Sequence, residues 1–187
     1  VHLAIASNAY VQLALNWALH VKKMLAVQGR EHAYFLAALD YRACNVLLSR
    51  ALPTLYVGLG DDSGNTEATA PLANFRLNFK LFRQFGVRKA ELLLWLLRAD
   101  RTVVLSDVDV AWIAPPDALI TSLAAAEVMA GTDCIDVNED DDRSHRSRTF
   151  ARCGHHLGAT WSAWFNTGVL VFRPTRKAIA FAAAWRA

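Results

Sequence analysis

Short apolar segments alternate with longer amphipathic ones along this chain, and this alternation most strongly limits the folds that it can adopt. Apolar runs at residues 1–7, 33–39 and 102–105 have the length and composition of buried β-strands. Between the first two, residues 9–26 carry apolar side chains at helical spacing. Strands that alternate with helices predict an α/β domain with a largely parallel central sheet.

Turn residues and changes of periodicity mark the remaining elements. Ser7-Asn8, Asp40 and Asp117 stand where helix N-caps are expected. The polar segments 58–71 and 138–148 are expected to be loops. We expect, in chain order, a helix over 41–50, a strand over 53–57, a helical region from Phe75 to Leu96 that is broken near Gly86, a helix over 118–125, strands over 127–131 and 165–172, and a helix over 175–186.

Length and composition favour one globular domain over residues 1–187. Apolar residues make up 54% and charged residues 20%, which excludes a disordered chain. The net charge of +3 comes from scattered basic residues, so we expect no nucleic-acid partner. The chain starts without Met and ends within a predicted helix. We therefore expect a fragment that lacks its C-terminal part, with any membrane anchor outside it.

Three cysteines, Cys44, Cys134 and Cys153, form neither a disulfide framework nor a zinc motif. The simplest interpretation is three thiols. The alternative is a disulfide between Cys134 and Cys153, which flank a polar loop, in an oxidising compartment.

Asp107 and Asp109 directly follow the apolar run at 102–105. In an extended segment, side chains two residues apart point to the same face, so both carboxylates would project together. Two adjacent carboxylates repel each other unless a positive charge lies between them. Mg²⁺ and Mn²⁺ prefer such oxygen ligands and take water and substrate phosphates as the others. The pattern predicts a metal–diphosphate site, and the alternative is a solvated loop.

Three segments together resemble one known family. They are residues 6–17, which begin Ala-Ser-Asn-Ala-Tyr, residues 105–112, Leu-Ser-Asp-Val-Asp-Val-Ala-Trp, and residues 165–174, which begin Phe-Asn-Thr-Gly. The chain is similar to the nucleotide-diphospho-sugar transferase family, the plant- and alga-type glycosyltransferases that include arabinosyl-, xylosyl- and galactosyltransferases. The resemblance implies a GT-A (Rossmann-like) fold, a UDP-sugar donor, Mn²⁺ or Mg²⁺ and retention of anomeric configuration. It also implies residence in the Golgi lumen as a type II membrane protein.

The resemblance suggests roles for the residues of the motifs. Asp109 would coordinate the metal directly, and Asp107 would contact it through water or hold the donor ribose. Asn166, Thr167 and Gly168 are expected to form a turn that enters a strand. There, glycine lets a ligand approach the backbone and the two polar side chains hydrogen-bond sugar hydroxyls. The alternative is a simple turn that starts the strand.

Four further residues are candidates for the donor site. Lys80, on the basic face of the long helix, is the candidate for the diphosphate, although such a face is more often simply solvated. Asn8, Tyr10 and Asp40 follow the first two strands, where GT-A proteins hold the nucleotide. Asn8 and Asp40 are alternatively helix caps, and Tyr10 a packing residue.

These observations predict a metal-dependent glycosyltransferase. It would move a pentose or galactose from a nucleotide-diphospho-sugar to a hydroxyl of a glycan or glycoprotein. The alternative is a non-catalytic GT-A-like scaffold that binds glycan or nucleotide, or a partner subunit. This alternative is motivated by the sequence ending before the region where GT-A enzymes commonly supply a histidine ligand. A phosphotransferase is disfavoured because no phosphate-cradling glycine loop follows a strand.

Overall fold

The computed structural model describes residues 1–59, 79–134 and 165–186. The predicted loop at 138–148, most of that at 58–71, and Cys153 lie outside these ranges. Within them, Cys44 is a buried free thiol and Cys134 is disulfide-bonded. The pairing of Cys134 with Cys153 stays a prediction.

Within the described ranges, six strands form one sheet in the order β3-β2-β1-β4-β6-β5. The first four strands of this order run parallel, β6 runs antiparallel to β4, and β5 runs antiparallel to β6. The sheet is therefore largely parallel, as predicted. The strands are β1 (His2–Ala6), β2 (Tyr34–Ala38), β3 (Thr54–Tyr56), β4 (Val103–Ser106), β5 (Val128–Thr132) and β6 (Phe165–Phe172).

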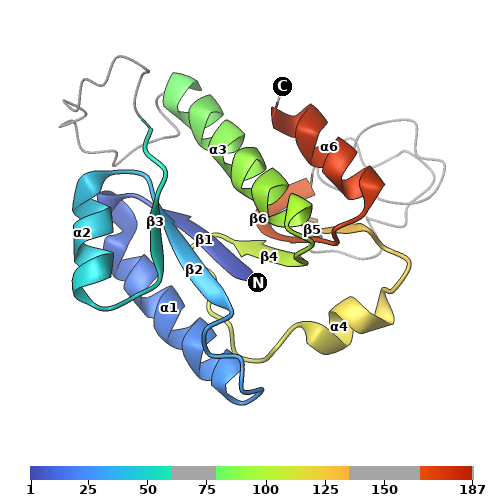
Figure 1. Cartoon of the computed structure of the whole chain (residues 1–187), viewed down its shortest axis with the longest axis horizontal. Helices are drawn as coiled ribbons and strands as arrows, with labels where there is room; N and C mark the ends of the chain where they lie inside the picture. The colour runs from blue at the N-terminus through green and yellow to red at the C-terminus, as the bar shows by residue number, and fades with distance from the viewer. Residues whose placement is uncertain (60–78, 135–164, 187) are drawn as a thin grey trace.

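Helices cover both faces of the sheet, α1 and α2 on one face and α3 and α6 on the other (Figure 1). In the described part of the chain, no helix is both long and apolar enough to cross a membrane. The helices are the 3-10 turn η1 (Asn8–Tyr10), α1 (Val11–Ala26), α2 (Tyr41–Ser49), α3 (Phe79–Arg98), α4 (Asp117–Ser122) and α6 (Arg176–Arg186).

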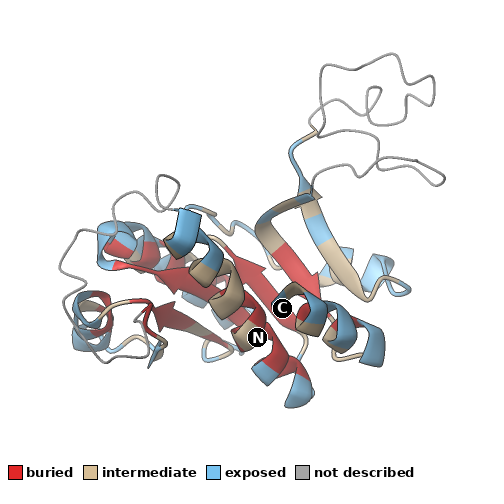
Figure 2. Ribbon diagram, turned by 90° about the horizontal axis from the view of Figure 1, so that it is seen from above, coloured by how far each residue is buried: buried red, intermediate tan, exposed pale blue. Residues whose placement is uncertain are grey.

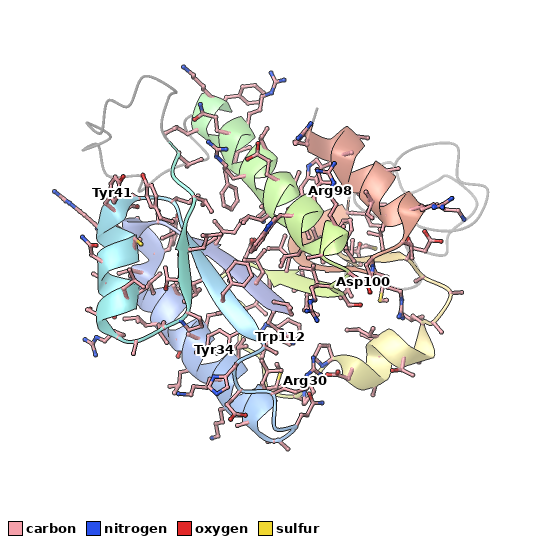
Figure 3. All side chains as sticks on the ribbon, in the orientation of Figure 1. Arg30, Tyr34, Tyr41, Arg98, Asp100 and Trp112 are labelled. Carbon is pink, nitrogen blue, oxygen red and sulfur yellow. The ribbon has the colours of Figure 1, made fainter. Side chains whose placement is uncertain are left out.

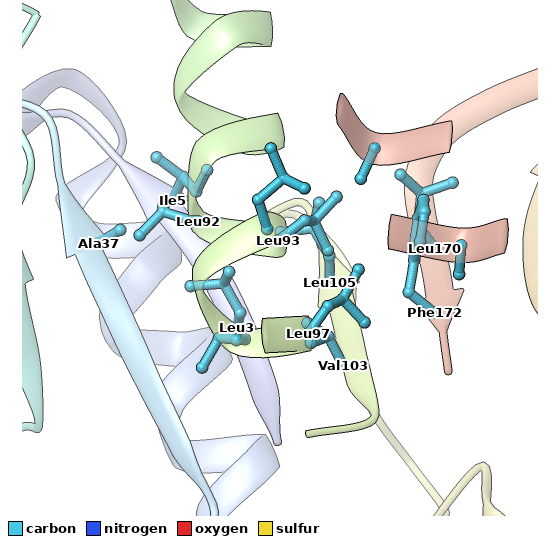
Figure 4. Packing of buried hydrophobic residues seen from close by; sticks show 14 of the residues in the cluster. Leu3, Ile5, Ala37, Leu92, Leu93, Leu97, Val103, Leu105, Leu170 and Phe172 are labelled. Atoms are coloured by element: carbon cyan, nitrogen blue, oxygen red, sulfur yellow. The ribbon is translucent and has the colours of Figure 1, made fainter. Parts of the chain in front are cut away.

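The central strands are buried on both faces, which is why they appear in the sequence as continuous apolar runs (Figure 2). In β1, Leu3 and Ile5 face α3, whereas Ala4 and Ala6 face α1. On the α3 side, Leu93 and the other leucines of that helix pack against β1, β4 and β6 (Figure 4). This packing fixes α3 across the end of β4, where the polar residues of interest begin.

Three details of the predicted elements are wrong. Helix α3 continues through Gly86, because the packing of its leucine stripe outweighs the roughly 1 kcal/mol that a glycine costs within a helix. Ser7 does not cap α1: its hydroxyl makes no cap hydrogen bond, and the chain enters α1 through η1. Asp117 is the first residue of α4 rather than its cap, and its carboxylate pairs with Arg30 at 2.8 Å.

Asp40 is the N-cap of α2, as predicted, and its two oxygens accept from Ala43 N at 2.8 Å and Asn8 N at 2.7 Å. We expect Asp40→Ala to lower the free energy of unfolding by about 1–2 kcal/mol, because both amides lose their acceptor. Urea denaturation measures this loss. Asp40→Asn keeps one acceptor oxygen and should lose at most half of the free energy of unfolding that Asp40→Ala loses. Equal losses in both variants would contradict the capping role.

Candidate functional site

Several of the polar residues predicted for the site lie at one edge of the sheet. Asp40 and Asp107 follow the carboxyl ends of the parallel strands β2 and β4, where ligands bind in such sheets. Strand β6 runs in the opposite direction, and Ser106 of β4 pairs with Val169. Residues 166–168 therefore lie beyond the end of β4, and Asp107 N donates to Gly168 O at 2.7 Å.

The Asp107–Asp109 segment is a turn and not an extended strand end. Strand β4 ends at Ser106, and Val110 N donates to Asp107 O at 3.3 Å. Val108 is buried in the core on the α1 side, whereas Asp109 is exposed. The prediction that both carboxylates project from one strand face is therefore wrong, because the chain turns directly after β4 instead of staying extended.

Lys89 of α3 is the positive group beside Asp107, and the sequence analysis missed it. Its Nζ donates to Asp107 Oδ1 at 2.7 Å and to Thr167 O at 3.4 Å, and it lies 4.8 Å from the centre of the Phe85 ring. The Lys89 side chain is 5% exposed, and that of Asp107 is 42% exposed. The ion pair thus joins α3, β4 and β6 at the edge of the sheet.

A signal for Lys89 was present in the sequence. Lys89 lies three, four, seven and eight residues before Leu92, Leu93, Leu96 and Leu97, all of which are buried. A lysine within an apolar stripe requires a buried partner, because lysine is rarely buried without one. The prediction followed the basic face of the helix instead and selected Lys80.

Lys80 itself lies exposed in the first turn of α3. Nine residues separate it from Lys89, which corresponds to about 13 Å along the helix axis. The structure therefore does not bring Lys80 together with Asp107. Its contact with a donor diphosphate stays a prediction.

Asn166, Thr167 and Gly168 lie within β6 and not in a turn before it. Asn166 Oδ1 accepts from Gly168 N at 2.6 Å, and Asn166 Nδ2 donates to Asp133 Oδ1 at 2.6 Å. A Cβ on residue 168 would lie 2.7 Å from Asn166 Oδ1 and 3.3 Å from Asp107 Oδ2. Glycine is needed here because the side chains of Asn166 and Asp107 approach this backbone closely.

Aromatic and polar residues also lie at or just after the carboxyl ends of β1, β2 and β3. Asn8 and Tyr10 are exposed, and Asn8 N is joined to Asp40. The Tyr41 and Tyr56 rings stack with their centroids 4.2 Å apart and an interplanar angle of 16° (Figure 3 labels Tyr41). Burial, followed by the proximity of Tyr41, raises the pKa of Tyr56. This part of the edge presents exposed aromatic surface that propensity arguments did not identify.

In the described ranges, no three His, Cys, Asp or Glu side chains gather into a group that could hold a metal ion. Lys89 engages Oδ1 of Asp107, and Asp109 is open to solvent. Two hard oxygen donors at an open edge suit Mg²⁺ or Mn²⁺, which commonly keep water and substrate phosphates as further ligands. Asp107 and Asp109 would therefore supply at most a part of the ligand set of such an ion.

Comparison with known proteins identifies the family. Residues 31–187 match the family described as nucleotide-diphospho-sugar transferase. Among curated protein sequences, none matches the chain.

Two solved structures of the galactosyltransferase LgtC agree with this chain in fold. The galactosyltransferase LgtC, in complex with donor and acceptor sugar analogues, has a TM-score of 0.55 at 16% identity, over 98% of this chain and 63% of its own. An active-site mutant of LgtC has a TM-score of 0.53 at 18% sequence identity, over 98% of this chain and 62% of its own. Mouse xyloside xylosyltransferase 1 has a TM-score of 0.46 at 11% sequence identity, over 98% of this chain and 69% of its own. This chain therefore spans less than two thirds of the length of LgtC.

The family match covers most of the chain, including the ion pair, the Asp107–Asp109 turn and strand β6. The chain belongs to the nucleotide-diphospho-sugar transferase family and has the GT-A fold.

Proposed function

We propose that this protein transfers a sugar from a UDP-sugar to a hydroxyl of a glycan or glycoprotein, with retention of configuration and with the help of a divalent metal. The observation that supports this most is the Asp107–Asp109 turn at the carboxyl end of β4, backed by the buried Lys89, in a member of this family. The proposal includes pentoses and galactose as transferred sugars.

The chemistry assigns a task to each group at the edge. Asp109 and Asp107 would hold Mn²⁺ or Mg²⁺, which supplies the positive charge that offsets the diphosphate leaving group. Lys89 holds one oxygen of Asp107 and so fixes the direction of the other. Asn166 and Thr167 flank the sugar, and Asn8, Tyr10 and Asp40 flank the nucleotide. For a retaining reaction in which departure and attack share one face, positioning and electrostatics provide most of the acceleration.

Titration of UDP into the protein tests this proposal, with Mn²⁺ or with EDTA. We expect binding that requires Mn²⁺ and that weakens at least about 100-fold in Asp109→Ala, since the ion loses a charged ligand. Asp109→Asn should behave in the same way because it removes the charge and keeps the shape. Glu31→Gln removes a carboxylate that precedes the amino end of β2 and should bind UDP like the wild type.

UDP binding that is the same with Mn²⁺ and with EDTA, and in the wild type and Asp109→Ala, would contradict the metal site. Absence of UDP binding under every condition would leave the family and the fold standing and favour a non-catalytic scaffold or partner subunit. If binding is found, turnover with UDP-arabinose, UDP-xylose and UDP-galactose identifies the sugar. Residence in the Golgi lumen, as a type II membrane protein, is proposed from the family resemblance alone.

A further inference from the structure

Two tryptophan side chains donate to one buried hydroxyl, in an arrangement outside the roles assigned above. Trp17 Nε1 of α1 donates to Ser106 Oγ at 2.8 Å, and Trp112 Nε1 donates to the same atom at 3.2 Å. Ser106 is the last residue of β4 and is 1% exposed. The two indoles therefore provide hydrogen bonds that water does not provide at this buried position.

Trp112 marks the point at which the chain returns to the sheet. Its ring, labelled in Figure 3, packs edge-on against that of His2 at the start of β1, with centroids 5.3 Å apart and planes at 87°. It also packs against the core cluster on the α1 side, which contains Val108. The chain beyond Asp109 thus folds back over this face and is fixed at Trp112.

The Asp107–Asp109 turn lies between these two anchored points. Its first residue is held by Gly168 O, at 2.7 Å from Asp107 N, and by Lys89. Three residues beyond Asp109, the chain is held again by the hydrogen bond from Trp112 to Ser106. We infer that Trp112 is a positioning residue: by tying the chain that follows the turn to Ser106, it fixes the direction of the exposed Asp109 carboxylate. The consequence for ligand binding rests on the proposed function, whereas the tether itself does not.

A matched pair of variants tests this inference. Trp112→Phe and Trp17→Phe each remove one indole N–H from the same oxygen and keep an aromatic ring. We expect Trp112→Phe to speed amide hydrogen exchange at Val110 about fivefold and to weaken UDP binding with Mn²⁺ about tenfold. Trp17→Phe should lower the thermal midpoint and leave both the exchange at Val110 and the affinity at wild-type values.

Equal effects of the two variants on exchange in the turn, or no effect of Trp112→Phe, would overturn the inference. Ser106→Ala removes the shared acceptor and should reproduce the faster exchange of Trp112→Phe; wild-type exchange in this variant would also overturn it. Hydrogen exchange needs no ligand. A wild-type protein that failed to bind UDP would therefore refute the proposed function, while the exchange comparison would still decide the role of Trp112.

Discussion

Replacing Asp107 with alanine should lower the free energy of unfolding by about 3–5 kcal/mol, because it leaves the buried Lys89 ammonium without its counter-ion. Among the described residues, Lys89 Nζ also lies 3.4 Å from Thr167 O and 4.8 Å from the centre of the Phe85 ring. A carbonyl and a ring face offset only part of the lost interaction. Urea denaturation at pH 7, followed by tryptophan fluorescence, measures the change.

Replacing one partner of the ion pair should change the free energy of unfolding much more than replacing the other. Lys89→Met should change stability by less than about 1 kcal/mol, since the Asp107 carboxylate that remains is 42% exposed and hydrated. The double variant Lys89→Met/Asp107→Ala should recover most of the stability that Asp107→Ala loses. The free energy of unfolding of Asp107→Asn should lie between those of the wild type and Asp107→Ala. Additive losses in the double variant would contradict the pairing.

Stability should also fall steeply with acid because of His2. Burial, the positive charges of the Val1 amino group and Arg30, in that order, lower the pKa of His2 from 6.5 to about 4, while Asp117 acts in the opposite direction. Between these two pKa values the unfolded chain binds a proton that the folded protein does not. The contribution of His2 is therefore lost as the pH falls from 6.5 to 4, and it amounts to about 3 kcal/mol.

Two variants separate this effect from packing. His2 is 2% exposed, and within the described residues its Nδ1 has no hydrogen-bond partner. His2→Phe removes the titrating group and keeps a ring against Trp112, so the decline in stability between pH 7 and pH 4.5 should be shallower than in the wild type. His2→Gln keeps a polar side chain and should flatten the decline equally. An unchanged slope in both variants would show that other groups cause the acid sensitivity.

The sequence predicted those elements whose signal is local. Strands β1, β2 and β4 are buried on both faces, so each is visible as an apolar run. Helix α3 is visible from its leucines, although one glycine suggested a break that packing overrides. The position of Asp107 after an apolar strand was likewise readable, because the carboxyl ends of parallel strands share one edge.

Contacts between segments that are distant along the chain could not be predicted from the sequence. Lys89 is identifiable in the sequence as a lysine on an apolar stripe, but periodicity cannot say which carboxylate it meets. Its partner depends on how α3 crosses β4 and on β6 running antiparallel beside that strand. The turn at Asp107–Asp109 likewise involves a distant segment, because Asp107 N donates to Gly168 O of β6.

The sequence by itself therefore determined the α/β class, the largely parallel sheet and the edge at which the acidic residues gather. Side chains that are buried on folding are mostly apolar, and they recur at the regular spacing of a helix or a strand, so the sequence shows them directly. Only the tertiary structure decided that Lys89 neutralises Asp107, that Gly168 accommodates the Asn166 side chain, and that two indoles converge on Ser106. These contacts join residues on separate elements, so they exist only once the helices and strands have packed.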